Sequence, residues 1–195
     1  MRELLFGLAG EALASCEEHG LADGTIYARV LLGLARAELG RTAEGVALLR
    51  QALAGGTEGG SRVEITRTLI YLAKAQALDS AVADALRTID DALRANPQEL
   101  LLRPETLRVR GELRLRQGDS GLAEADFREA IALAQKLGAK AWELRAATSL
   151  ARLLRDNNRR DEAQAMLAEV YNWFTEGFGT ADLKDAKALL DQLSA

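Results

Sequence analysis

Small and large apolar residues recur along this chain at helical spacing, in four similar blocks. The blocks begin at Ile26, Thr66, Pro104 and Leu144 and align without internal gaps. The eighth position is small in every block: Gly33, Ala73, Gly111 and Ala151. Later columns are small at Gly45, Ala85, Ala123 and Ala163, and large at Leu49, Ile89, Phe127 and Leu167. Small residues let antiparallel helices approach closely, and a large residue fills the space one turn further along. The pattern predicts helical hairpins, and the lack of sustained two-residue alternation predicts no sheet.

Turn-forming residues separate the predicted helices. The turns within hairpins fall at Gly40, Ser80, Gly118 and Asn158, and the links between hairpins at Gly20 and Gly138. Side chains that can accept hydrogen bonds from the first amides of a helix follow these turns. We expect caps on the second helices at Thr42, Ser80, Ser120 and Asp161, a capping box at Ser61 and Glu64, and a cap on the last helix at Thr180.

These columns resemble the tetratricopeptide repeat, a helix–turn–helix unit that stacks into a right-handed superhelix. The residues that carry the resemblance are Leu72, Ala73, Ala85, Ile89, Ala92 and Pro97, and again Leu150, Ala151, Leu154, Ala163 and Leu167. The usual aromatic residue near the end of the first helix is missing, and the repeat is longer than the family's. The resemblance implies an all-α fold, a right-handed α-α superhelix of about ten helices.

On this interpretation the chain is a single solenoid over residues 1–195. Its parts are a half-hairpin at 1–24, repeats at 26–60, 66–99, 104–138 and 144–177, and a capping helix at 180–193. A capping helix would cover the last hydrophobic face of the array. The half-hairpin leads us to expect a fragment of a longer protein.

A second resemblance is carried mainly by the last quarter of the chain, and Arg110-Gly111-Glu112-Leu113 and Glu17-Glu18-His19-Gly20 extend it over nearly the whole chain. The stretch from Arg145 to Leu193 is similar to the C-terminal end of bacterial proteins that carry tetratricopeptide arrays. In those proteins the array follows an ATPase module and a class III nucleotide cyclase or a DNA-binding transcriptional domain. The most specific segment runs from Tyr171 to Leu183 and includes Trp173-Phe174-Thr175-Glu176-Gly177-Phe178. The resemblance implies a sensor or scaffold segment of a bacterial signalling protein.

Composition narrows the function. The 195 residues include 25 Lys and Arg against 29 Asp and Glu, a formal net charge of −4 at pH 7. That balance argues against nucleic-acid binding, even through the most basic predicted helix, which carries Arg103, Arg108, Arg110, Arg114 and Arg116. No apolar run is long enough to cross a membrane, and the N-terminus does not fit a secretory signal. We therefore expect a cytoplasmic protein that binds neither nucleic acid nor membrane.

Residues that could carry chemistry are few. The glycines at 55, 56, 59 and 60 lack the Lys and Ser or Thr that a phosphate-binding loop needs. Cys16 and His19 lie on one helical face, but zinc needs further ligands and the chain has no other Cys or His. Neighbouring carboxylates such as Asp90 and Asp91 diverge on a helix and cannot flank one substrate. We predict no catalytic residue, no cofactor and no metal.

The aromatic residues Trp173, Phe174 and Phe178 form the densest cluster of their kind. We expect them to pack between the fourth hairpin and the last helix, because the final hairpin of a solenoid must bury its open face. The alternative is an exposed anchor for a partner.

In tetratricopeptide arrays the outward face of each first helix lines a concave groove. The corresponding positions in this sequence include seven basic and four acidic residues, a local excess of positive charge. The candidate groove residues are Tyr27, Leu34, Arg67, Lys74, Arg108, Arg116, Arg145, Arg152 and Arg155. We hypothesise that the groove binds a protein or peptide with an acidic or carboxylate end, held by arginine forks. The alternative is ordinary surface arginine covering Leu-rich helices.

A structural role is the remaining alternative. If the half-hairpin at 1–24 leaves apolar surface uncovered, two copies could pair through it as a homodimer. The contact residues would then be Leu4, Leu5, Phe6 and Leu8.

Overall fold

The computed structural model describes residues 2–56, 62–98 and 100–194, with side chains for residues 7–55, 63–98 and 100–194. The predicted capping box at Ser61, the glycines at 59 and 60, and the side chains of Leu4, Leu5 and Phe6 lie outside these residues.

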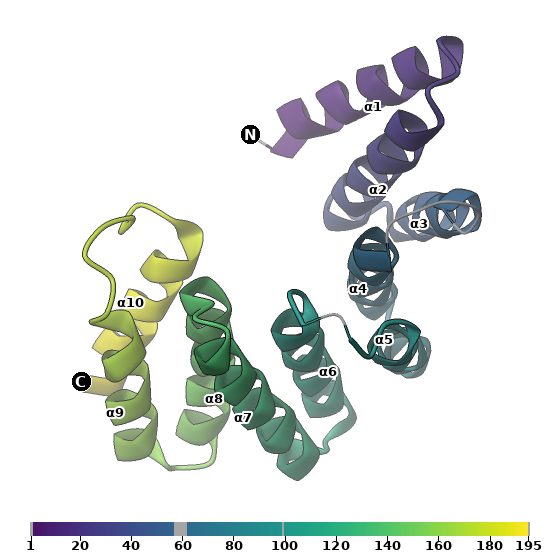
Figure 1. Cartoon of the computed structure of the whole chain (residues 1–195). Coiled ribbons are helices and arrows are strands. Elements are labelled where there is room, and N and C mark those ends of the chain that lie inside the picture. The colour runs from purple at the N-terminus through teal and green to yellow at the C-terminus, as the bar shows by residue number, and fades with distance from the viewer. Residues whose placement is uncertain (1, 57–61, 99, 195) are drawn as a thin grey trace. The chain divides into compact units, whose positions relative to one another are not determined.

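Ten α-helices and no strand make up the secondary structure of the described residues (Figure 1). They are α1 (Arg2–Glu18), α2 (Ala22–Glu38), α3 (Thr42–Gly56), α4 (Arg62–Leu78), α5 (Val82–Ala95), α6 (Arg103–Gln117), α7 (Ser120–Lys136), α8 (Lys140–Asp156), α9 (Arg160–Tyr171) and α10 (Ala181–Ser194). The predicted all-α fold of about ten helices is confirmed.

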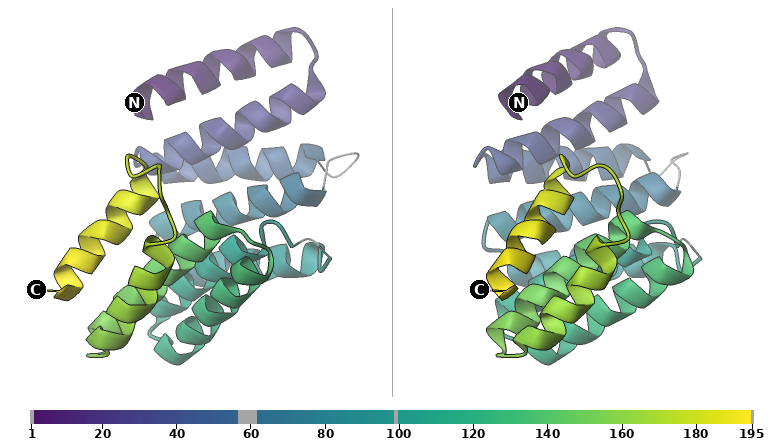
Figure 2. Two further views of the ribbon diagram at one scale, coloured as in Figure 1. Left: turned by 60° about the vertical axis from the view of Figure 1, so that its left-hand side comes forward. Right: turned by 90° about the vertical axis from the view of Figure 1, so that its left-hand side faces the viewer.

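The chain forms two compact units, Met1–Leu102 and Arg103–Ala195. In the first unit each helix packs against the next, and α2 also packs against α4. In the second unit the same holds for α6 to α10, and α8 also contacts both α6 and α10. Successive helices run antiparallel within each unit (Figure 2). The repeat limits inferred from the sequence stay a prediction.

The predicted small residues lie where helices cross. Ala73 and Ala151 are fully buried. A Cβ built on Gly45 of α3 would lie 2.5 Å from the carbonyl oxygen of Gly33 in α2. A Cβ on Gly111 would lie 2.5 Å from Cε1 of the fully buried Phe127. Only glycine allows these helices to approach so closely, so the prediction of small residues at the crossings is confirmed.

The turns also follow the prediction. Gly20, Gly40, Gly118 and Gly138 have positive φ, and so do Ser80 (φ 60°) and Asn158 (φ 61°). This left-handed conformation closes each preceding helix with a backbone hydrogen bond, such as Ala81 N–H to the Gln76 carbonyl (3.0 Å).

The predicted caps on three second helices are wrong. The cap positions of α5, α7 and α9 are Ala81, Asp119 and Arg159, and none makes a side-chain capping hydrogen bond. Ser80 forms the left-handed turn, whereas Ser120 and Asp161 lie within their helices. Thr42 is likewise the first residue of α3, and its hydroxyl donates to Asp79 Oδ1 at 3.0 Å. The left-handed residue shifts the start of the next helix, which displaces the polar side chain from the capping position.

Candidate functional site

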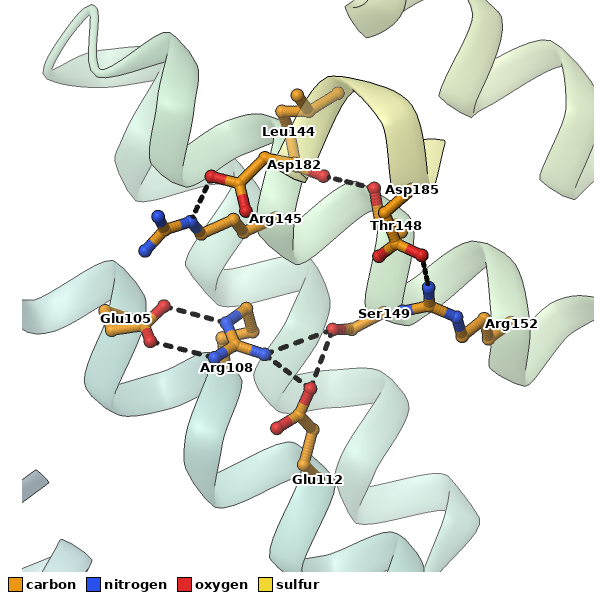
Figure 3. Close-up of polar contacts among 10 residues, drawn as sticks. All are labelled: Glu105, Arg108, Glu112, Leu144, Arg145, Thr148, Ser149, Arg152, Asp182 and Asp185. Atoms are coloured by element: carbon orange, nitrogen blue, oxygen red, sulfur yellow. Dashed lines mark hydrogen bonds and ion pairs between the residues drawn. The ribbon is translucent and has the colours of Figure 1, made fainter. Parts of the chain in front are cut away.

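The arginines of α8 form a row along one side of that helix. Arg145 donates from Nε to Asp182 Oδ2 at 2.6 Å, and Arg152 forms an ion pair with Asp185 (Figure 3). Arg155 donates to the side-chain oxygen of Gln192 at 3.0 Å. All three partners belong to α10, so a second helix lies along the row and supplies it with oxygen acceptors.

Apolar burial holds α10 in this position. Leu183, Ala186, Leu189 and Leu193 are buried in a core shared with α8 and α9. They form one stripe at helical spacing, while Lys184, Lys187 and Asp191 on the other side are exposed. Because the stripe fixes the register of α10, the acidic residues at its edge meet the arginines of α8.

The arginine row keeps hydrogen-bonding capacity toward solvent. The side chains of Arg145 and Arg152 are 39% and 40% exposed. The two terminal nitrogens of Arg145 have no hydrogen-bond partner among the described residues, and its guanidinium lies 5.0 Å from the Trp142 ring centroid. Ion pairs this exposed contribute at most about 1 kcal/mol. Arg145 and Arg152 can therefore bind another carboxylate with little loss of stability.

Arg108 has a different environment. Its side chain is 12% exposed and binds both oxygens of Glu105, at 2.7 and 2.8 Å, as well as Glu112 (Figure 3). Ser149 of α8 donates to Glu112 at 3.1 Å and so joins α6 to α8. Burial lowers the pKa of Arg108, but hydrogen bonds and charge from Glu105 and Glu112 outweigh it and raise the pKa above its ordinary value. Arg108 is thus enclosed between acidic groups of its own helix.

The other candidate residues are spread over both units. Arg116 is exposed in the last turn of α6. In the first unit Tyr27 is exposed on α2, and Leu34 on the same helix is half-buried. Arg67 and Lys74 are half-buried on α4, where Arg67 pairs with Glu64 at 3.1 Å. Within each unit these residues belong to first helices that pack against each other, α2 with α4 and α6 with α8.

Sequence reasoning missed Asp182, Asp185 and Gln192. Their position beside the apolar stripe of α10 could be seen in the sequence. Polar residues at the edge of such a stripe lie next to the residues that border the core on the neighbouring helix. Using this pattern required knowing that α10 packs against α8.

The aromatic cluster has one half-buried member, Phe174, and two exposed members, Trp173 and Phe178. Phe174 packs against the core of the second unit, as predicted. Trp173 is 58% exposed, with the Lys140 ammonium 5.5 Å from its ring centroid. Phe178 is also exposed and lies beside Tyr171, with ring centroids 5.9 Å apart. The prediction of packing is therefore wrong for Trp173 and Phe178, because the core beneath α10 is already filled by leucine and alanine.

Potential metal ligands are scattered in this fold. Within residues 2–56, 62–98 and 100–194, no group of three or more His, Cys, Asp or Glu side chains is placed to hold a metal ion. His19 Nδ1 lies 2.8 Å from the Ser15 carbonyl, a contact within one helical turn. No helix in the described part of the chain combines the length and apolar character needed to span a bilayer.

Comparison with known proteins supports a tetratricopeptide-like region. Residues 102–176 match the tetratricopeptide repeat family. The structure is similar to that of BtubC (BKLC) from P. vanneervenii, with a TM-score of 0.76, 16% identity, and coverage of 100% of this chain and 90% of that one. A Podosopora anserina protein with nearly identical TPR-like repeats gives a TM-score of 0.68 at 17% identity, with coverage of 86% and 84%.

A third similar structure is that of a thermophilic TPR protein in Thermus thermophilus, with a TM-score of 0.58 at 17% identity and coverage of 100% and 99%. No curated protein matches the chain in sequence. At these identities the likeness establishes a shared fold: an all-α array of TPR-like helical hairpins.

Proposed function

We propose that this chain is a non-catalytic scaffold that binds an acidic segment of a partner protein along the first-helix face of its second unit. Helical repeat arrays present extended surfaces suited to binding other polypeptides. The observation that carries the proposal is the arginine row of α8, which already holds Asp182 and Asp185 of a neighbouring helix.

The contacts between α8 and α10 indicate the kind of ligand. A helix with carboxylates one or two turns apart would present them to Arg145 and Arg152 as α10 does. An extended peptide with carboxylates at a similar distance would do the same. Arginine binds carboxylates through several nitrogens at once. The two terminal nitrogens of Arg145 make no hydrogen bond to another group among the described residues. The binding energy would come from charge-assisted hydrogen bonds at a half-exposed surface.

The wider role follows from the sequence resemblance of Arg145–Leu193. We propose that the chain is the sensor or regulatory segment of a bacterial cytoplasmic signalling protein. Its part in such a protein would be recognition of a partner, with any catalysis supplied by other modules.

Two pairs of substitutions test the binding site. The probe is a synthetic fluorescein-labelled peptide with aspartates at helical spacing, and fluorescence anisotropy gives its Kd. Arg145→Gln with Arg152→Gln removes the cations, so we expect the Kd to rise about tenfold. Asp182→Asn with Asp185→Asn frees the same arginines, so we expect the Kd to fall.

The two double variants are matched, because each removes the same two ion pairs between α8 and α10. A loss of affinity in both would show that the position of α10, rather than arginine charge, governs binding. Raising the salt concentration should weaken binding to the unmodified chain. A Kd that changes neither with salt concentration nor with the arginine substitutions would refute the proposal.

A further inference from the structure

A groove between α1 and α2 is used by none of the contacts described above. It encloses about 260 Å³ and is lined by Leu8, Ala9 and Ala12 of α1 and by Leu31, Leu34 and Ala35 of α2. Leu8 is 54% exposed and Leu31 is 41% exposed. Among the described residues α1 packs against α2 alone. The groove is therefore an apolar helix–helix junction with one side uncovered.

The second unit shows what covers the equivalent junction there. In one gapless register α1 corresponds to α7 and α2 to α8, with Ala9 over Phe127 and Leu31 over Ser149. Phe127 packs against Gly111 of α6, and Ser149 donates to Glu112 of α6. The equivalent of the α1–α2 groove is thus occupied by α6, a helix antiparallel to α7. Comparison of the two units therefore indicates that the groove fits one helix.

Side-chain differences define the chemistry of that helix. Ala9 stands where the second unit has Phe127, so the occupant has room for a large apolar side chain where α6 has glycine. Leu8 stands where the second unit has the buried Asp126, which Arg110 and Arg114 of α6 bind at 2.6 and 2.7 Å. An arginine opposite Leu8 would lack that acceptor. The occupant should therefore be apolar at the positions where α6 is basic.

The net charge of the segment that forms α1 and α2 favours a different protein over a second copy. Residues 2–38 contain three arginines and six carboxylates, a net charge of −3. Glu38 also lines one end of the groove. A second copy would bring the same negative charge against this surface, whereas Lys or Arg on the flanks of a different helix would be attracted to it.

We propose that the α1–α2 groove binds an amphipathic α-helix of a partner protein, aligned antiparallel to α1. Its apolar face carries leucine-sized side chains over Ala9 and Ala12, and its flanks carry lysine or arginine. This site is separate from the arginine row of α8, and its ligand is basic where the ligand proposed for α8 is acidic. Disproof of the acidic ligand would therefore leave this proposal unaffected.

Peptide binding to the full chain tests this site. The probe is a fluorescein-labelled helical peptide of 17 residues, the length of α1, with a leucine stripe and flanking lysines. One control peptide has the same composition with the leucines dispersed around the helix, and another has glutamates in place of the lysines. We expect saturable binding of the first peptide, and binding at least tenfold weaker for both controls.

Matched variants locate the binding. Leu31→Gln lies in the groove and should weaken binding about tenfold. Leu122→Gln alters a leucine of α7 that is also exposed and should leave the Kd unchanged. Circular dichroism of each variant verifies that the fold is intact. If Leu31→Gln perturbs the fold, Leu31→Ala, which introduces no polar group, should also weaken binding.

Three results would overturn the proposal. One is absence of saturable binding, and another is equal affinity for the dispersed-leucine peptide. The third is a dimer in sedimentation equilibrium that Leu31→Gln dissociates, since a second copy would then be the occupant.

Discussion

Replacing Gly45 by alanine tests a close helix crossing in the first unit. The new Cβ would lie 2.5 Å from the Gly33 carbonyl oxygen and 2.9 Å from both the backbone nitrogen and the Cβ of Ala37. Real Cβ contacts do not fall below about 3 Å, so α2 and α3 would have to separate. Two of the three neighbours are backbone atoms, which cannot move away by changing a rotamer.

The expected magnitude is the balance of two effects. Overpacking costs roughly 1–3 kcal/mol, and a clash with backbone belongs at the upper end of that range. Alanine in place of glycine within a helix returns about 1 kcal/mol through helix propensity. The free energy of unfolding should therefore fall by about 2 kcal/mol. For the first unit alone, Met1–Leu102, which has about 100 residues, the corresponding decrease in Tm is about 8–16 °C.

Urea denaturation followed by far-ultraviolet circular dichroism measures this change. Both tryptophans, Trp142 and Trp173, belong to the second unit, so their fluorescence reports that unit separately. The control is Gly10→Ala in α1, where a Cβ would meet no atom within 4 Å, and where we expect stabilisation by about 0.5–1 kcal/mol. A Gly45→Ala variant that is as stable as the unmodified chain, or that gains stability as Gly10→Ala does, would refute the predicted clash between α2 and α3.

Three further substitutions test other features. Asp126→Asn removes the charge of a buried carboxylate that pairs with Arg110 and Arg114, so thermal denaturation should show a loss of about 3 kcal/mol. Ser80→Gly relieves the left-handed backbone at that turn, and urea denaturation should show stability that is higher by about 0.5 kcal/mol. Burial raises the pKa of Glu124, but hydrogen bonds from Arg128 and Arg159 outweigh it and hold the pKa below its ordinary value. This carboxylate therefore stabilises the fold above pH 4.5, its ordinary pKa, and that contribution is lost as the pH falls through the lowered pKa. Glu124→Gln should make Tm less sensitive to acid as the pH falls below 4.5; an unchanged acid dependence would contradict this assignment.

The repeated small residues and the turn residues were enough to predict the helical hairpins. Gly33, Gly111 and their equivalents could be recognised because close helix crossings exclude larger side chains, and that exclusion repeats with each hairpin. The turn residues were equally visible, since left-handed backbone favours glycine, and asparagine or serine can replace it. The cap predictions failed over one or two residues, because the left-handed turn set the helix start and polar residue type alone did not.

The tertiary structure alone decided what the candidate site contains. Arg145 and Arg108 looked alike as basic residues on first helices, yet one is half-exposed beside Asp182 and the other is enclosed by Glu105 and Glu112. Trp173 lies largely in solvent although its neighbour Phe174 is half-buried and packs against the core. Helical spacing fixes which face of its own helix a side chain occupies. Its partner is fixed by which helices pack together and in what register, and that choice depends on the apolar surface buried by the whole unit.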